Sequence, residues 1–211
     1  SRRQGHDILI RHEVDLKAIL DGSSAEMDAE LPILCIDCEG TGAKDGITKQ
    51  CSECDGSGQV RVRQQIGPFV QDSVRACSSC DGSGRISAAK CKTCAGDGLQ
   101  SESQKLRFTV PKGAQDGTRL RMRGKGQPAP KGNGDSGDLF IELVIEEHQW
   151  FERNGMDLIM SLPLGFSDLA LGTNVTLPHI DDKDLVIKVP SGTNSGDTIT
   201  IPARGLPSSR G

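Results

Sequence analysis

The chain has 211 residues, including 26 glycines and eight cysteines, and only 3% of its residues are aromatic, so a core of Ile, Leu and Val is thin for this length. Its formal net charge of −4 argues against a nucleic-acid partner, because such proteins usually carry a basic face. No apolar run approaches the roughly 20 residues that span a bilayer, which argues against a membrane segment.

The start of the chain predicts a strand followed by a short helix. In residues 7–14 (DILIRHEV), every second side chain from Ile8 to Val14 lies on one face, as in a half-buried strand. The following residues, 14–22 (VDLKAILDG), predict a single helical turn that ends at Gly22.

All eight cysteines lie in four copies of one pattern, Cys-x-x-Cys-x-Gly-x-Gly, which begin at Cys35, Cys51, Cys77 and Cys91. Disulfides are one interpretation, but a bridge inside a Cys-x-x-Cys pair closes a very short loop and constrains the unfolded chain little. A redox dithiol is another, but that motif normally occurs once and precedes an apolar helix.

Zinc explains the cysteines and the glycines together. Two Cys-x-x-Cys pairs complete one tetrahedral site, and glycine allows the positive φ that turns backbone N–H groups toward sulfur. Four copies give two closed sites with no ligand left over, and closed sites are structural because a catalytic zinc keeps a position for water. The spacing is compatible with pairing of neighbouring copies and with a nested pairing, first with fourth and second with third.

The rest of the chain predicts further strands and one more helical turn. Residues 105–110, 137–145 and 184–189 alternate between apolar and polar side chains, and Gly and Pro clusters between them mark turns. Residues 167–172 (SDLALG) predict a second short helical turn.

A second repeat lies outside the cysteines. Residues 110–128 (VPKGAQDGTRLRMRGKGQP) match residues 189–207 (VPSGTNSGDTITIPARGLP) at an offset of 79 (189 minus 110). Residues 7–22 match residues 157–172 at an offset of 150 (157 minus 7). The first copy therefore holds 71 more residues than the second (150 minus 79), which is close to the length of the cysteine segment.

These patterns predict a mainly β fold: two tandem related β-sandwich-like domains, with a two-zinc cysteine-rich β-ribbon module inserted in the first. The expected limits are 1–32 plus 100–147 for β-domain I, 33–99 for the zinc module and 148–211 for β-domain II. We expect β-domain II to be truncated at its C-terminus, because the strand at 137–145 has no counterpart after residue 207.

With this organisation the chain resembles the DnaJ family of J-domain co-chaperones, in the class with a cysteine-rich region. The four cysteine copies inserted in the first of two β-domains carry the resemblance, as do HQWFERNGMDL (148–158), GDLF (137–140) and LALG (169–172). It covers the middle and C-terminal parts of the family, without the J-domain and the dimerisation segment.

The resemblance implies the nested pairing and two structural zinc ions. One ion would be held by Cys35, Cys38, Cys91 and Cys94, and the other by Cys51, Cys54, Cys77 and Cys80.

The resemblance also implies a chaperone without catalytic chemistry, which binds unfolded or non-native polypeptides and delivers them to a DnaK-type ATPase chaperone. A client peptide would add along an edge strand of β-domain I and place an aliphatic side chain in a shallow apolar pocket. The matching pocket positions are Ile10, Met27, Ala29, Leu106 and Ile141.

We expect a cytoplasmic protein that is a homodimer at full length and a monomer as this chain. Two other classes of function stay open. A zinc-containing dithiol oxidoreductase or disulfide isomerase would have exposed, reactive thiols. A nucleic-acid-binding zinc ribbon would bind with strongly salt-dependent affinity.

Overall fold

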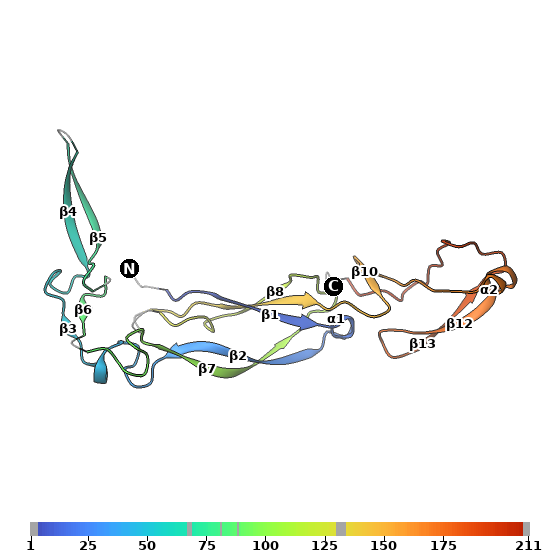
Figure 1. The fold of residues 1–211 in the computed structure, drawn as a ribbon, viewed down its shortest axis with the longest axis horizontal. Coiled ribbons are helices and arrows are strands. Elements are labelled where there is room, and N and C mark those ends of the chain that lie inside the picture. Colours follow the sequence, from blue (N-terminus) through green and yellow to red (C-terminus); the bar gives the residue numbers. More distant parts are fainter. Residues whose placement is uncertain (1–3, 67–68, 81, 88, 130–133, 209–211) are drawn as a thin grey trace. The chain divides into compact units, whose positions relative to one another are not determined.

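The computed structural model in Figure 1 describes residues 4–66, 69–80, 82–87, 89–129 and 134–208. The chain divides into two compact units. The first comprises the described residues of Ser1–Leu9, Asp28–Gln104 and Arg121–Phe140, and the second those of Ile10–Met27, Lys105–Leu120 and Ile141–Gly211. The domain limits expected from the sequence follow other borders and stay a prediction.

The fold is mainly β, which confirms the predicted class. In chain order the elements are β1 (Ile8–Val14), α1 (Leu16–Asp21), β2 (Ser24–Leu34), the 3-10 turn η1 (Lys44–Gly46), β3 (Lys49–Gln50), β4 (Gln59–Ile66), β5 (Phe69–Ala76), β6 (Arg85–Ile86), β7 (Leu99–Thr109), β8 (Arg119–Met122), β9 (Leu139–Ile145), β10 (Glu152–Asn154), β11 (Asp157–Ile159), α2 (Phe166–Leu171), β12 (Thr173–Pro178) and β13 (Asp184–Val189). One sheet has the order β1-β9-β8, and the other strands pair as β2-β7, β3-β6, β4-β5, β10-β11 and β12-β13. None of the described helices has the length and apolar character needed to cross a membrane.

Strand β9 is the most deeply buried element of the first repeat. Its inward-facing residues Leu139, Ile141 and Leu143 alternate along the strand and have no exposed surface. The strand lies between β1 and β8 in the sheet, so it receives neighbours on both edges. Alternation of large aliphatic side chains on a central strand explains why this segment forms the core.

The short helix α1 is fixed at both ends, as its sequence predicts. The Asp15 carboxylate accepts a hydrogen bond from the Ala18 N–H at 2.7 Å, which caps the first turn. Gly22 ends the helix in the left-handed region, with φ 69° and ψ 47°.

Within the cysteine segment, strands β4 and β5 form a long antiparallel hairpin, drawn in teal and green in Figure 1. Its register runs from Gln59 opposite Ala76 to Ile66 opposite Phe69. The cysteine pattern predicts a ribbon in this module, but not a hairpin that extends so far beyond the inner cysteines.

Equivalent hydrogen bonds show that the two repeats share one backbone framework. The Gly113 N–H donates to the Ile19 carbonyl at 3.0 Å, and at the matching positions the Gly192 N–H donates to the Leu169 carbonyl at 2.9 Å. A second matching pair joins Gln127 to His6 at 2.9 Å and Leu206 to Met156 at 2.7 Å. Both pairs are related by the offsets found in the sequence.

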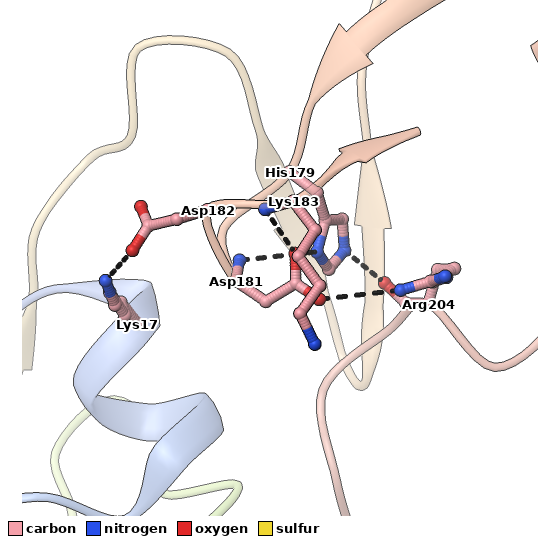
Figure 2. Close-up of polar contacts among 6 residues, drawn as sticks. All are labelled: Lys17, His179, Asp181, Asp182, Lys183 and Arg204. Atoms are coloured by element: carbon pink, nitrogen blue, oxygen red, sulfur yellow. Dashed lines mark hydrogen bonds and ion pairs between the residues drawn. The ribbon is translucent and has the colours of Figure 1, made fainter. Parts of the chain in front are cut away.

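The turn between β12 and β13 is held by a polar network around the buried His179 (Figure 2). Its Nδ1 lies 2.9 Å from the Asp181 carboxylate, and its Nε2 lies 2.9 Å from the Arg204 carbonyl. Asp182 in the same turn pairs with Lys17 of α1. This network fixes the segment around Arg204 beside the hairpin.

Candidate metal centres

The structure gathers the eight cysteines into two groups of four. Each group brings its four sulfur atoms within 4.8 Å of one another: Cys35, Cys38, Cys91 and Cys94 in one, and Cys51, Cys54, Cys77 and Cys80 in the other. This is the nested arrangement. The outer group joins the first and fourth copies of the cysteine pattern, and the inner group joins the second and third.

The sulfur separations match a tetrahedral zinc site. Sulfurs of paired copies lie 3.7 to 3.9 Å apart. A tetrahedron with Zn–S distances of about 2.3 Å has S···S edges of about 3.8 Å, whereas a disulfide needs about 2.05 Å. All eight cysteines are free thiols. Each group can therefore hold one zinc ion, whose role would be to crosslink a module with little apolar core.

Reciprocal backbone bonds select these partners. In the outer group the Cys35 N–H donates to the Gly98 carbonyl and the Cys91 N–H donates to the Gly42 carbonyl, both at 2.9 Å. The inner group repeats the pattern: Cys51 bonds Gly84 at 2.9 Å, and Cys77 bonds Gly58 at 3.0 Å. The first cysteine of each copy is thus tied to the last glycine of its partner copy.

The last glycine of each copy meets two requirements at once. Gly42 has φ +70°, and a Cβ there would lie 2.2 Å from the carbonyl oxygen of Gly96. Gly98 has φ +78°, and its Cβ would lie 2.4 Å from the carbonyl oxygen of Gly40. A side chain at either position would strain the backbone and force the two copies apart.

The same glycines place N–H groups against sulfur. Their amides lie 3.1 to 3.3 Å from the second cysteine of their own copy, as the sequence analysis expected: Gly42 on Cys38, Gly58 on Cys54, Gly84 on Cys80 and Gly98 on Cys94. Such donors stabilise thiolate, the form that binds zinc.

The thiol pKa values differ within each group. Burial raises the pKa of Cys38 to about 11 and that of Cys77 to about 12. For Cys80 and Cys94 burial acts in the same direction, but glycine N–H groups and neighbouring thiols outweigh it and lower the pKa to about 7. Cys80 and Cys94, one in each group, therefore ionise near neutral pH, whereas zinc binding would displace protons from Cys77 and Cys38.

The five positions expected to bind a client lie on four strands. Ile10 is on β1, Met27 and Ala29 are on β2, Leu106 is on β7 and Ile141 is on β9. Leu106, Ile141 and Ala29 are buried, whereas Ile10 and Met27 are half-buried. Only the last two therefore offer surface to a ligand, and the pocket stays a prediction.

Sequence reasoning missed the polar contacts that stabilise the second unit. The sequence analysis assigned no role to His179, whose Nδ1 lies 2.9 Å from the carboxylate of Asp181, two residues later. The Arg153 guanidinium donates to the Ala114 carbonyl at 2.6 Å, and no spacing signal joins residues so far apart. The short His-x-Asp spacing was the one available clue.

The model of the DnaJ C-terminal domain family matches residues 8–211. The chain belongs to this family. Proteins named Chaperone protein DnaJ are similar along nearly all of it: that of Chlorobium phaeobacteroides is 39% identical over 98% of this chain and 52% of its own length. The protein of Bacillus cereus is 38% identical over 99% of this chain and 56% of its own length. The protein of Haloferax mediterranei is 36% identical over 97% of this chain and 53% of its own length. This DnaJ C-terminal chain thus spans about half the length of the curated relatives it matches.

Proposed function

We propose that this chain is the client-binding part of a DnaJ-type co-chaperone, which binds unfolded or non-native polypeptides for delivery to a DnaK-type ATPase chaperone. The family match over residues 8–211, together with two cysteine groups of zinc geometry, is the observation that carries the proposal. Relatives named Chaperone protein DnaJ support the chaperone role. The delivery step is proposed for the whole protein.

Strand β2 and the residues beside it are the proposed client site. Among the described strands β2 pairs only with β7, so its other edge offers N–H and carbonyl groups to an extended peptide. The side chain of Met27 is half-buried on this strand and flexible enough to accept differently shaped aliphatic groups. Main-chain bonding gives tolerance of sequence, and the apolar positions give a hydrophobic preference.

The test compares two neighbours on β1 whose side chains point to opposite faces. Ile10→Ser should weaken binding of an unfolded client about tenfold, because it removes an apolar contact worth about 1–2 kcal/mol. Leu9→Ser is the control, since Leu9 is on the opposite face and 49% exposed. Binding is measured by fluorescence anisotropy and by suppression of client aggregation. Equal affinities for the two folded variants would remove Ile10 from the site.

Leu106 and Ile141 are poor positions for this test. Both are almost fully buried, so a polar substitution there would unfold the chain before it reported on binding. Met27→Ser is the better second variant, because its side chain is half-buried and close to a free strand edge.

The oxidoreductase alternative is separated by the accessibility of the thiols. No cysteine is more than 7% exposed, which favours closed metal sites over reactive dithiols. In the zinc-loaded chain we expect thiol reagents to react only after a chelator is added. Fast reaction and turnover on scrambled disulfides at full zinc occupancy would favour the enzyme.

A further inference from the structure

A polar hollow of about 410 Å³ lies in the cysteine module, and none of the eight cysteines, all of which the structure describes, lines it. Three short segments surround it, which begin at Thr41, Ser83 and Ala95. The first and third begin in the copies of the outer cysteine group, and the second begins in the third copy, which belongs to the inner group. The lining residues all fall within one compact unit. Both cysteine groups therefore border this hollow.

The lining of the hollow is polar and carries two cations. Arg85 on β6 and Lys90 just before the fourth cysteine copy are both exposed. Within the described part of the chain, neither side chain makes a hydrogen bond or an ion pair, and the hydroxyls of Thr48 and Ser87 have no partner there either. Asp97 supplies a carboxylate, so the formal charge of the lining is +1 (two cations minus one carboxylate).

The stem of Lys90 is held against a glycine of the fourth copy. A Cβ on Gly96 would lie 3.2 Å from the Cδ of Lys90 and 3.3 Å from its Cγ. The backbone at Lys90 is fixed as well, because it forms a β-bridge with Ala43 and the next residue, Cys91, donates its N–H to the Gly42 carbonyl at 2.9 Å. The ammonium group thus extends from an ordered stem, which lowers the entropy that a bound ligand would cost.

The second copy shows the same position with a satisfied head group. Gln50 precedes that copy as Lys90 precedes the fourth, at an offset of 40 (90 minus 50), and a Cβ on Gly56 would lie 3.1 Å from its Cγ. The side-chain amide of Gln50 donates to the Asp55 carbonyl at 2.7 Å. Among the described residues, the Lys90 ammonium makes no such bond to Ala95, the counterpart of Asp55. One backbone frame therefore presents a bonded amide in one copy and an uncommitted charge in the other.

The backbone of Arg85 is fixed in a similar way. Strand β6 pairs with β3 so that Arg85 lies opposite Gln50. The hydroxyl of Ser83 lies 2.9 Å from the Arg85 carbonyl and 2.6 Å from that of Cys80, which ties this segment to the third cysteine copy. Arg85 and Lys90 thus bring two cations with fixed backbones to one hollow.

Charge compensation is the simpler explanation for cations near a zinc site. A zinc ion with four thiolates carries net negative charge, which nearby lysines and arginines offset. That explanation does not account for a concave surface, nor for the uncommitted hydroxyls of Thr48 and Ser87 on it. It also predicts that the cations stabilise metal binding, which can be measured separately from ligand binding.

We propose that this hollow binds an acidic side chain of a polypeptide partner, with Arg85 and Lys90 as the donors to its carboxylate. The arginine fork can hold both oxygens of a carboxylate, and the lysine adds a point charge. The hydroxyls of Thr48 and Ser87 can donate to main-chain carbonyl groups on either side of the acidic residue. Asp97 disfavours ligands with several negative charges, such as nucleic acid, and can accept an N–H of the partner.

The size and polarity of the hollow favour a polypeptide segment over a small apolar ligand. Small-molecule sites are lined mainly by hydrophobic and aromatic side chains, whereas Ala95 is the one apolar side chain among the described lining residues. A hollow of about 410 Å³ is larger than a carboxyl group, so the main chain beside the acidic residue would enter it too. This site lies on other residues than the proposed client site.

The probe is the peptide GSEGS, blocked at both ends and titrated into the isotope-labelled, zinc-loaded chain. We expect saturable changes in the NMR shifts of the Thr48, Arg85 and Lys90 amides. The matched peptide GSQGS, which keeps the shape and lacks the charge, should bind at least about tenfold more weakly. Inorganic phosphate, titrated separately, should also bind more weakly than GSEGS, because it makes no main-chain contacts and Asp97 opposes its second charge.

Protein variants locate the site. Lys90→Gln removes the charge but keeps a stem on Gly96, and it should weaken binding of GSEGS about tenfold. Lys92→Gln is the matched control, because Lys92 is exposed two residues away and does not line the hollow. Asp97→Asn should strengthen binding, since it removes the opposing charge, and a purely structural role of the lining would not produce that gain.

Zinc release separates ligand binding from charge compensation. We expect Lys90→Gln and the unmodified chain to release zinc at the same chelator concentration. Ile10→Ser, the variant that tests the proposed client site, should leave GSEGS binding unchanged, so failure of that site and failure of this one are distinguishable.

Three results would overturn the proposal. One is the absence of saturable GSEGS binding by the folded, zinc-loaded chain. Another is a loss of charge dependence or of position dependence: GSQGS or phosphate binding as tightly as GSEGS, or Lys92→Gln weakening binding as much as Lys90→Gln. The third is zinc release by Lys90→Gln at a lower chelator concentration with the affinity for GSEGS unchanged, which would assign the cations to charge compensation.

Discussion

At the scale of single residues, the glycine that ends each cysteine copy determines how the copies pair. Gly42 and Gly98 each lie against the backbone of the partner copy and each accept a hydrogen bond from its first cysteine. Cysteine alone would tolerate several pairings, since any two Cys-x-x-Cys pairs supply four thiolates. The close backbone approach is what makes the nested pairing specific.

The pair Gly42 and Gly46 tests this role. Both have nearly the same left-handed backbone, φ +70° and +69°, but a Cβ on Gly46 would meet nothing within 4 Å. Gly46→Ala should cost only the left-handed strain of about 1–2 kcal/mol. Gly42→Ala should cost more, because its Cβ meets the Gly96 carbonyl oxygen, and it should release zinc at lower chelator concentration. Equal chelator midpoints for the two variants would contradict the role of close approach.

Residue-level patterns predicted the metal ligands but not which copies pair. The Cys-x-x-Cys-x-Gly-x-Gly copies point to four-thiolate sites because residue type and spacing suit tetrahedral zinc. Spacing could not choose between neighbouring and nested groups, since the choice depends on bonds such as Cys35 to Gly98 between distant segments. At the client positions, alternation could not tell the fully buried Ile141 from the half-buried Ile10, because both occupy the inward face of a strand.

At the scale of elements, the loop after β8 is tied to the start of β9 by Asp138. Its carboxylate accepts the Gly124 N–H at 2.8 Å and the Arg121 Nε–H at 2.7 Å. These two donors hold the pKa of Asp138 below its ordinary value of 3.8, and the Gly124 amide has the larger effect. A lowered carboxyl pKa means that the folded state favours the charged form, so its contribution to stability is present above pH 3.8 and is lost as the pH falls further.

Replacing this carboxylate should change the acid sensitivity of the fold. Asp138→Asn should be less stable than the unmodified chain at neutral pH, and should lose less stability when the pH falls below about 4. Asp28→Asn is the control, since Asp28 is exposed on β2 and its side chain makes no hydrogen bond or ion pair among the described residues. Urea unfolding followed at several pH values measures both. If Asp138→Asn and the unmodified chain lost the same free energy of unfolding as the pH fell below about 4, the carboxylate of Asp138 would not be the source of the acid sensitivity.

Elements with strong alternation were predictable, and those defined by long-range pairing were not. The predicted strand at 184–189 coincides with β13, and those at 7–14 and 137–145 coincide with β1 and β9 to within two residues. Strand β2 contains Glu26, Asp28, Glu30 and Pro32, residue types that are depleted in strands, so local propensity did not mark it. Its strand conformation depends on pairing with β7 across the whole cysteine segment.

At the scale of the whole molecule, the zinc module and the second repeat have different sources of stability. The module around the two cysteine groups has thiols where a larger domain would have aliphatic side chains. Zinc bound by such groups contributes about 10–16 kcal/mol in small zinc-finger peptides. The second repeat depends instead on backbone bonds and on the network around His179.

Zinc removal should therefore act locally. With a strong chelator we expect the Cys35 and Cys51 amides to lose protection from hydrogen exchange, because the backbone bonds of the module form only when its copies are held together. The Gly192 amide, which bonds Leu169 in the second repeat, should keep its protection. Exchange followed by mass spectrometry separates the two segments. A loss of protection that is equal in both would show that the metal stabilises the whole chain.

The nested pairing also sets the order in which the module assembles. The inner thiols Cys51 and Cys77 are 26 residues apart, whereas the outer thiols Cys35 and Cys91 are 56 apart. Closing the shorter loop first costs about 0.7 kcal/mol less chain entropy, and it then shortens the free path that the outer closure must span. Metal uptake should run from the tip of the ribbon toward its base, with the inner ion filling first. Stopped-flow zinc loading of two variants tests this order. In Cys51→Ser, which lacks the inner site, the outer site should fill more slowly than in the unmodified chain. In Cys35→Ser, which lacks the outer site, the inner site should fill at its normal rate.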